Sequence, residues 1–209
     1  MPDTIHLLIA INDKQVQKAI TNKLTLNFPN TLLSYKENGA NALLDLNQEE
    51  IDIAILHHDL PLLTAIEISQ KCTSKTKLIL VSDVGNIEMY QKSKECGFLA
   101  YLSLDDIEHE IDSCLRAVMN NSCFISQTMI DLIKMFGELS EKLAKLSPTE
   151  ILFLSEVKEG KNYQEISDKL VLSSKSINKI TSSISEKLDI PKKEKALVNW
   201  TQENKSIFN

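Results

Sequence analysis

The chain has 209 residues, of which 43% are hydrophobic and 25% are charged, a composition ordinary for one or two soluble globular domains. No apolar run approaches the roughly 18 residues of a membrane span, and the amino terminus lacks the pattern of a signal peptide. The four cysteines are widely spaced without a C-x-x-C pair, which argues against zinc and favours free thiols at Cys72, Cys96, Cys114 and Cys123. We therefore expect a cytoplasmic protein without membrane association.

The net charge of −6 is unevenly distributed along the chain. Residues 1–138 hold 11 Lys and Arg against 19 Asp and Glu, a net −8, whereas residues 139–209 hold 12 Lys against 10 Asp and Glu, a net +2. Phosphate contacts supply most non-specific DNA affinity. The carboxyl-terminal part is therefore the only candidate nucleic-acid surface, and its small charge implies modest binding unless a dimer doubles the contacts.

Short apolar runs alternate with polar segments of helical length over the first 125 residues. The apolar runs are residues 5–11, 32–35, 51–56, 78–81 and 99–102, and the polar segments are residues 14–27, 38–47, 62–72, 86–95 and 105–119. This alternation predicts a doubly wound α/β fold whose five-stranded parallel sheet is covered on both faces. Ligands of such sheets lie at the carboxyl ends of the strands, near the point where the strand order reverses.

Residues 127–145 predict a helical linker, either one helix or a pair of helical turns. Their apolar content indicates packing against another surface rather than a free tether. The apolar residues are Met129, Ile130, Ile133, Met135, Phe136, Leu139 and Leu143. We expect a first domain over residues 1–126 and a second domain over residues 146–209.

The second domain begins with two predicted helices that have clear boundaries. Pro148 can open the first helix, because the N–H that proline lacks would have no partner there. Gly160 ends this helix. The second helix runs from about residue 162 to residue 170.

Two further helices complete the predicted second domain. Ser173 or Ser174 is a good N-cap for the third helix, whose apolar stripe comprises Ile177, Ile184 and Leu188. Pro191 stops that helix, and a fourth runs from residue 192 to about residue 203. Two helices joined by a tight turn, the second rich in Ser and Lys on its outer face, are typical of a helix-turn-helix.

The spacing of residues in this domain resembles that of the LuxR-type (NarL/FixJ-type) DNA-binding domain. The family pattern runs L-T-x-R-E, G-x-x-x-x-E-I-A-x-x-L-x-[IL]-S, T-V-K-x-H and K-L. The matching positions here are residues 146–150, 160, 165–167, 170–173, 176–180 and 187–188. The resemblance implies an all-α four-helix helix-turn-helix domain that binds double-stranded DNA. A small helical bundle without a ligand is the alternative interpretation.

The first 126 residues resemble the receiver domain of a response regulator. The matching landmarks are Pro61, Ser82 and residues 96–97, 100–102 and 124–126. The resemblance implies a flavodoxin-like strand order and a known chemistry, in which an aspartate at the end of the third strand takes a phosphoryl group. That chemistry needs acidic oxygens that hold Mg²⁺, and a lysine and a hydroxyl that meet the new charge.

Four of the five positions that carry this chemistry in the family hold unsuitable residues here. The acceptor lies four residues before Pro61, which places His57 there. The acidic pair falls on Ile11 and Asn12, and the lysine position falls on Leu104. The resemblance therefore implies a degenerate phospho-acceptor pocket, in a pseudo-receiver that works without phosphorylation and without a cofactor.

Two residues linked to switching in the family are retained, the hydroxyl residue Ser82 and the aromatic residue Tyr101. Asp59 and Asp13 lie close in sequence to the lost positions. A slip of one residue along a strand reverses its faces, so Asp13 would point elsewhere. A Mg²⁺ site with at most one carboxylate would be poor.

One interpretation of the sequence His57-His58-Asp59 is a transition-metal site, since imidazole is a common metal ligand. A phospho-histidine is another. No third ligand lies at a recognisable spacing, and His6 and His109 are far off in sequence. The alternative is that His57 fills the vacated pocket as a neutral hydrogen-bonding side chain. We predict this alternative and no metal site.

The third predicted helix of the second domain carries the candidate DNA contacts. By resemblance, Asn178, Lys179 and Ser182 occupy the family's recognition positions. Asn can pair with adenine and Lys can donate to guanine in the major groove. Lys175 and Lys161 are better placed for phosphate contacts. The alternative for Lys175 and Lys179 is ordinary solvated charge.

Two positions of the third predicted helix depart from the family pattern. The usual Lys of T-V-K is Asn178, and the usual His is Ile180. Ile180 can be a core residue, a contact to a thymine methyl group or part of a partner surface, and the sequence does not decide between these.

The fourth predicted helix carries Ala196, Leu197 and Trp200 at helical spacing. The family resemblance implies a dimer contact for this helix. The alternative is packing onto the third helix, and both can hold for different residues. A two-fold homodimer would read two half-sites about one helical turn apart.

These observations predict a bacterial transcription regulator, an atypical response regulator that binds double-stranded DNA as a homodimer. An enzyme is not expected, because no nucleophile–base pair, metal cluster or phosphate loop is evident. In one alternative the protein no longer binds DNA and sequesters another regulator. In the other, the degenerate receiver pocket binds a small ligand that controls the protein.

Overall fold

The structure is a computed structural model that describes residues 4–83, 85–193 and 195–204. The chain divides into two compact units, and the division falls after Lys134. Each unit has a hydrophobic core of its own. None of the helices in the described ranges combines the length and apolar character that crossing a membrane requires.

The first unit is built on a parallel sheet, as predicted. Its strands are β1 (Ile5–Ala10), β2 (Thr31–Lys36), β3 (Ile53–His57), β4 (Lys77–Ser82), β5 (Ala100–Ser103) and β6 (Phe124–Ile125). The order β2-β1-β3-β4-β5-β6 reverses at β1, as in the doubly wound folds. The prediction of five strands was wrong by one, because a two-residue strand such as β6 is too short to show a hydrophobic period.

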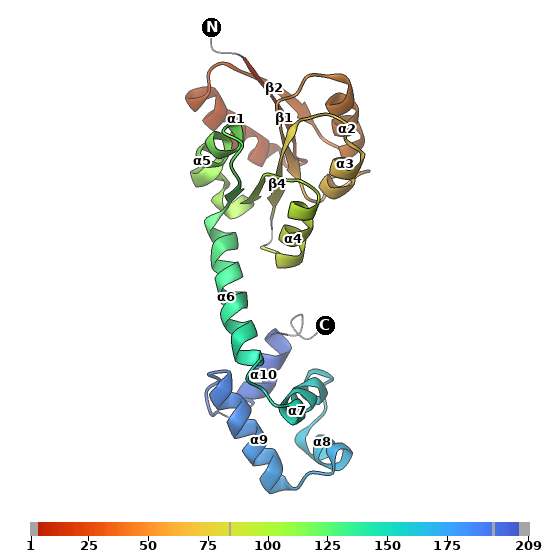
Figure 1. Cartoon of the computed structure of the whole chain (residues 1–209), viewed down its shortest axis with the longest axis vertical. Helices are drawn as coiled ribbons and strands as arrows, with labels where there is room; N and C mark the ends of the chain where they lie inside the picture. Colours follow the sequence, from red (N-terminus) through yellow and green to blue (C-terminus); the bar gives the residue numbers. More distant parts are fainter. Residues whose placement is uncertain (1–3, 84, 194, 205–209) are drawn as a thin grey trace. The chain divides into compact units, whose positions relative to one another are not determined.

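Helices cover both faces of this sheet (Figure 1). One face packs against α1 (Lys14–Asn27) and α5 (Ile107–Met119), and the other against α2 (Gly39–Gln48), α3 (Ala65–Lys71) and α4 (Ile87–Glu95). Along β1, Leu7 and Ile9 join one core whereas Leu8 and Ala10 join the other. Side chains alternate between the faces of a strand, so a strand covered on both sides is apolar throughout.

The helix α6 (Gln127–Leu143) is continuous, where the sequence left one helix or two turns open. At its start, the N–H of Gln127 donates to Glu110 at 3.2 Å and the N–H of Thr128 donates to Asp106 at 2.9 Å. These carboxylates satisfy N–H groups that lack partners within the helix. Met129 is fully buried in the core of the first unit, so the start of α6 belongs to that unit.

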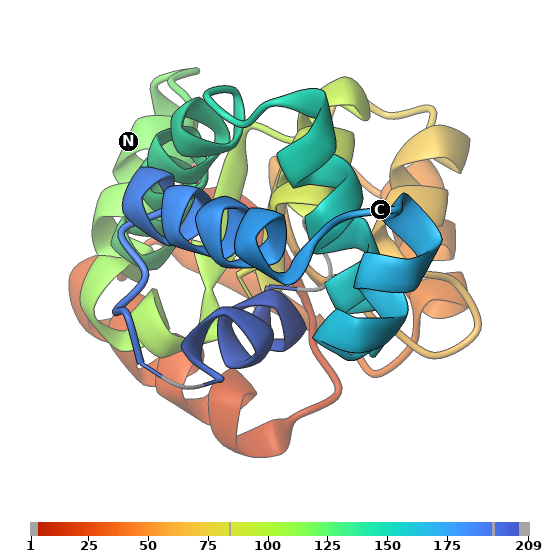
Figure 2. The ribbon, with the colours of Figure 1, turned by 90° about the horizontal axis from the view of Figure 1, so that it is seen from below.

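The described part of the second unit contains the four predicted helices. They are α7 (Pro148–Lys158), α8 (Tyr163–Leu170), α9 (Ser174–Lys187) and α10 (Ala196–Glu203). Side-chain oxygens of Ser147, Asn162 and Ser173 cap the first three by accepting from backbone N–H groups. The helices α8 and α9 run in different directions from the short turn that joins them (Figure 2). This arrangement is that of a helix-turn-helix.

The last helix begins later than predicted, at Ala196 rather than at residue 192. Lys195 has a left-handed backbone with φ of 62°, which is incompatible with an α-helix that continues through it. Sequence propensity gave no sign of this turn, because lysine is a good helix former.

Candidate functional site

The five positions that carry phosphoryl transfer in receiver domains lie at the carboxyl edge of the sheet in this chain. Ile11 and Asn12 follow β1, His57 ends β3, Ser82 ends β4 and Leu104 follows β5. Because all of these strands are parallel, the five residues lie at one edge of the sheet, where the ligands of such folds bind.

The first strand presents no acidic pair at this edge within the described residues. Ile11 is buried, and its carbonyl accepts a hydrogen bond from the side-chain amide of Gln17. Asn12 is exposed. Leu104 opens a short 3₁₀ turn and packs against the core, in the position where the family resemblance would place a lysine.

The carboxylate nearest to the lost acidic pair in the sequence is used elsewhere. Asp13 is the N-cap of α1, and its Oδ1 accepts from the N–H groups of Gln15 at 2.7 Å and Val16 at 3.1 Å. A side chain in this role faces the helix start. Asp59, the other nearby carboxylate, is exposed in the loop after β3. The capping contacts of Asp13 agree with the expectation that this carboxylate does not restore the missing pair.

The two residues linked to switching in the family are both buried. Ser82 is 2% exposed and Tyr101 is 1% exposed. The Tyr101 ring meets the ring of Tyr90 from α4 nearly edge-on, with centroids 5.7 Å apart. Edge-to-face pairs of this kind are favourable aromatic contacts, so Tyr101 is held in an inward position.

The loop after β4 brings Asp83 to the two histidines, a neighbour that the sequence spacing did not indicate. Asp83 Oδ1 lies 3.2 Å from His57 Nε2 and 3.0 Å from His58 Nδ1. Burial and the adjacent His57 ring lower the pKa of His58, against the opposing pull of Asp83 and Asp59. The neighbour follows from the pairing of the strands, because Asp83 comes directly after β4, which pairs with β3.

In the second unit, the structure places the predicted DNA-contacting residues of α9 on one exposed face. Lys175, Asn178, Lys179 and Ser182 are all exposed. Their spacing of three and four residues aligns them along the helix. The predicted apolar stripe of α9 is buried on the opposite side in the core of the unit, and it comprises Ile177, Ile184 and Leu188.

Ile180, which the sequence left open between three roles, is half-buried and packs against the core of the second unit. This contact favours the first role, that of a core residue. Ile180 therefore does not interrupt the exposed face of α9, which stays polar at Asn178 and Lys179.

Lys161 is less suited to a phosphate contact than predicted. Its Nζ donates to the carboxylate of Glu156, which also accepts from Lys169 Nζ at 2.6 Å. The hydrogen bonds from Lys161 and Lys169 hold the pKa of Glu156 below its usual value. A lysine whose charge is already paired contributes less binding free energy through a contact with a phosphate.

Lysines that the sequence analysis did not single out lie beside α9. A hollow of about 260 Å³ is lined by Ser182 together with Lys192, Lys193 and Lys195 from the turn before α10. These lysines are exposed. They extend the basic surface from α9 across the turn. Their charge partly replaces that of Lys161, which is paired with Glu156.

The three residues assigned to a dimer contact all pack within their own unit. Leu197 is 4% exposed, and Ala196 and Trp200 lie partly buried against the same core. This packing is the alternative that the sequence left open. Ala196 and Trp200 keep part of their surface exposed, so packing within the unit and a dimer contact are compatible for these two residues.

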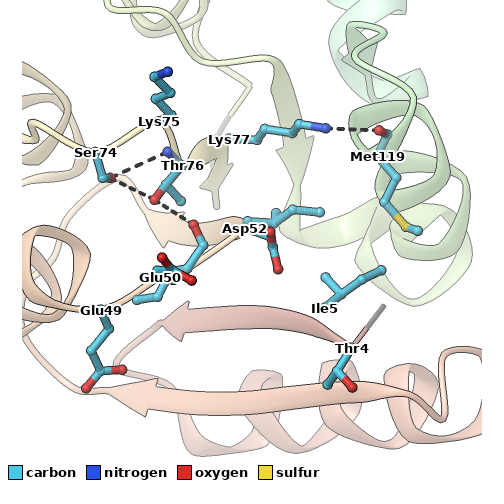
Figure 3. A pocket seen from close by; sticks show the side chains of 12 residues that line it. Thr4, Ile5, Glu49, Glu50, Asp52, Ser74, Lys75, Thr76, Lys77 and Met119 are labelled. Carbon is cyan, nitrogen blue, oxygen red and sulfur yellow. Dashed lines mark hydrogen bonds between the residues drawn. The ribbon is translucent and has the colours of Figure 1, made fainter. Parts of the chain in front are cut away.

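A larger hollow of about 570 Å³ lies at the opposite, amino-terminal edge of the sheet (Figure 3). Its charged lining mixes both signs, with Glu49, Glu50, Asp52, Lys75 and Lys77. Much of its polar lining is bonded within the protein: Lys77 Nζ donates to the carbonyl of Met119 at 2.9 Å, and Thr76 donates to that of Ile51 at 2.8 Å. This pattern is typical of a solvated surface rather than of a ligand site.

Comparison with known proteins agrees with the two-part organisation. Residues 144–199 match the family described as bacterial regulatory proteins, luxR family. The chain is 24% identical to the transcriptional regulatory protein DesR of Bacillus subtilis over 92% of this chain and 94% of that protein. It is 22% identical to the DNA-binding transcriptional activator EvgA of Escherichia coli K12, over 94% of this chain and 98% of that protein.

Solved structures share the fold of the chain. One structure of the RcsB response regulator of Salmonella typhimurium aligns with a TM-score of 0.64 and 18% identity, over 95% of this chain and 98% of that one. RcsB in a complex with DNA aligns with a TM-score of 0.58 over the same shares of the two chains. These alignments confirm the predicted succession of a receiver-like α/β domain and a helical domain.

Proposed function

We propose that this chain is a response regulator of the LuxR type that acts on transcription by binding DNA. From this premise, α9 reads DNA as part of a homodimer, and binding does not require aspartyl phosphorylation. The proposal assigns residues 1–126 to a pseudo-receiver, residues 127–145 to a linker and residues 146–209 to DNA binding. The observation that carries it is the exposed polar face of α9, with Lys175, Asn178, Lys179 and Ser182 in line.

The chemistry of this face suits the major groove. Asn178 can donate to and accept from adenine, and Lys179 can donate to the acceptors of guanine. Lys175 at the start of the helix and Lys192 and Lys193 beyond it suit phosphates, which fix orientation without reading sequence. With a net charge of only +2 on residues 139–209, affinity would depend on two units that bind together.

Independence from phosphorylation is supported by what occupies the receiver edge. His57 stands where the acceptor aspartate is expected, and Asp13 is engaged as a helix cap. The buried Ile11 and the core-packed Leu104 offer apolar side chains at the remaining positions. We infer that the receiver serves as a dimerisation or interaction module, and that no catalytic step is performed there.

The relatives support a dimer on DNA. EvgA is named a DNA-binding transcriptional activator, and RcsB has been solved as two dimers bound to two DNA molecules. A dimer of this chain would bind two half-sites related by two-fold symmetry.

Selection of bound fragments from randomised DNA by the full chain, without a phosphodonor, should enrich a two-fold motif. The double variant Asn178→Ala and Lys179→Ala should then bind that motif at least about tenfold more weakly, because each base contact contributes roughly 1–3 kcal/mol. Lys145→Ala removes the same charge from an exposed position outside α9 and should bind nearly as the unmodified chain does. Affinity is measured by titration at fixed salt.

The outcomes separate the proposal from its alternatives. No enrichment by folded, dimeric protein would favour an interaction module that modulates another regulator. Equal losses in the α9 variant and in Lys145→Ala would mean that only overall charge matters. A motif that appears only after treatment with acetyl phosphate would show that the assignment of the acceptor position to His57 is wrong.

A further inference from the structure

The carboxyl edge of the sheet holds a compact group of three metal-ligating side chains, His57, His58 and Asp83. His57 is the last residue of β3 and Asp83 follows the last residue of β4. These two strands pair directly, with His57 opposite Val81. The parallel pairing therefore delivers the two histidines and the aspartate to the same point of the edge.

Adjacent residues of a strand point to opposite faces, so two successive histidines would ordinarily diverge. Here the strand ends at His57, and the chain bends at His58. The two rings lie together, with centroids 4.6 Å apart and planes inclined at 55°. Both rings consequently reach the same oxygen of Asp83.

The spacing of the three ligand atoms fits a small metal ion. His57 Nε2 and His58 Nδ1 lie 3.2 and 3.0 Å from Asp83 Oδ1, and all three atoms lie within 4.8 Å of one another. Ligands about 2.0–2.1 Å from a tetrahedral zinc ion lie about 3.3 Å apart. The two nitrogen–oxygen distances are thus close to the spacing of ligands around such an ion.

One of these three atoms is a buried polar atom without a hydrogen bond. His58 Nδ1 is buried and lies close to Asp83 Oδ1, but it makes no hydrogen bond with any of the described residues. A buried polar atom without a partner costs stability. Coordination of an ion by this nitrogen would satisfy it.

We propose that His57, His58 and Asp83 bind one divalent transition-metal ion of the zinc type. This replaces the expectation from the sequence of no metal site, in which the third ligand Asp83 was not recognised. Two imidazoles and one carboxylate suit zinc and its first-row neighbours, whereas Mg²⁺ prefers oxygen ligands in an octahedral arrangement. Water would complete the shell, since Asp83 is 53% exposed. The ion would connect the loops after β3 and β4 at the edge where a receiver carries its phosphoryl group. This proposal is independent of DNA binding.

The test is a titration of the chelator-treated full chain with zinc chloride, followed by calorimetry. The background carries Cys123→Ser, because Cys123 is exposed and a thiol can bind zinc. Cys114 is buried, and burial raises the pKa of its thiol to about 12, so it does not compete. We expect one equivalent of zinc to bind, and magnesium chloride not to displace it.

Asp83→Ala and His58→Gln should each weaken zinc binding at least about tenfold, since even outer-shell changes cost 10–100-fold. His109→Gln alters an exposed histidine outside the group and should bind zinc as the background does. Circular dichroism checks that each variant is folded, and Asp83→Ala, on an exposed side chain, is the variant least prone to misfold. With cobalt, the background should give a tetrahedral visible spectrum without a thiolate charge-transfer band.

Three results would overturn the proposal. The first is the absence of stoichiometric zinc binding by the background protein. The second is equal binding by Asp83→Ala and by the background, and the third is a thiolate band with cobalt. Either of the last two would place the ion at other ligands such as Cys72 or Cys96.

Discussion

Glu150→Gln is expected to lower the free energy of unfolding of the second unit by about 2–3 kcal/mol. The Glu150 carboxylate is 5% exposed and accepts hydrogen bonds from the N–H of Ser147 at 2.6 Å and from Lys187 Nζ at 2.7 Å. Removal of one partner of a buried pair costs roughly 3–5 kcal/mol, because the other charge stays behind. The Lys187 side chain is 33% exposed, so water offsets part of that cost.

The same contacts make the second unit sensitive to acid. Burial raises the pKa of Glu150, but hydrogen bonds from Lys187, Ser183 and Ser147 outweigh it and lower the pKa from 4.5 to about 2. A carboxyl group with a depressed pKa contributes stability that is complete above its unfolded value. This contribution should therefore be present above about pH 4.5 and should be lost as the pH falls toward about 2. Glu150→Gln should flatten that part of the stability profile.

The chain offers a direct readout and a matched control for this prediction. Trp200 is the single tryptophan and packs against the core of the second unit, so its fluorescence follows the unfolding of that unit in urea. Glu165 holds the same capping-box position in α8 that Glu150 holds in α7, but it is exposed. Glu165→Gln should cost no more than about 1 kcal/mol. Equal losses in the two variants would show that capping, rather than the pair with Lys187, stabilises α7.

The sequence predicted those features that local patterns encode. Alternating apolar runs and polar segments indicated the parallel sheet with two covered faces, because buried parallel strands are apolar throughout. Proline, glycine and serine marked the ends of α7 and the start of α9, since each acts through its own backbone chemistry. The polar face of α9 followed from the helical period alone.

The features that the sequence did not predict depend on contacts between distant or irregular segments. Asp83 and His57 are 26 positions apart and meet only because β3 and β4 pair. Lys161 and Glu156 are five positions apart across the end of α7, a spacing that no helical ridge brings together. Such contacts belong to the tertiary structure, which is why the charge of Lys161 looked available in the sequence.

Gly39→Ala is expected to destabilise the first unit by about 3 kcal/mol, at the upper end of the usual cost of overpacking. A Cβ on Gly39 would lie 1.9 Å from the carbonyl oxygen of Leu63, whereas real Cβ atoms stay beyond 3.0 Å. The two nearest atoms are backbone, and the N–H of Gly39 donates to the carbonyl of Pro61 at 2.9 Å. Neither α2 nor the loop after β3 can move without loss of this contact.

That loop has little freedom to absorb the methyl group. Leu62 already has a left-handed backbone with φ of 71°, which is costly for a residue other than glycine. Thr64 and Glu67 form a capping box that fixes the start of α3 immediately afterwards. The added volume therefore has to displace the amino-terminal end of α2, whose Ala42 and Leu46 are fully buried in the core.

Gly137→Ala provides the comparison, because Gly137 lies in α6 and no neighbouring atom of the described residues lies within 4 Å of the position that an alanine Cβ would take there. Alanine is favoured over glycine within a helix by up to about 1 kcal/mol, so this variant should be neutral or slightly more stable. Far-UV circular dichroism in urea follows the whole chain, while Trp200 fluorescence isolates the second unit, which Gly39→Ala should leave unchanged. If Gly39→Ala proved as harmless as Gly137→Ala, the close approach of α2 to the loop after β3 would not exist in solution.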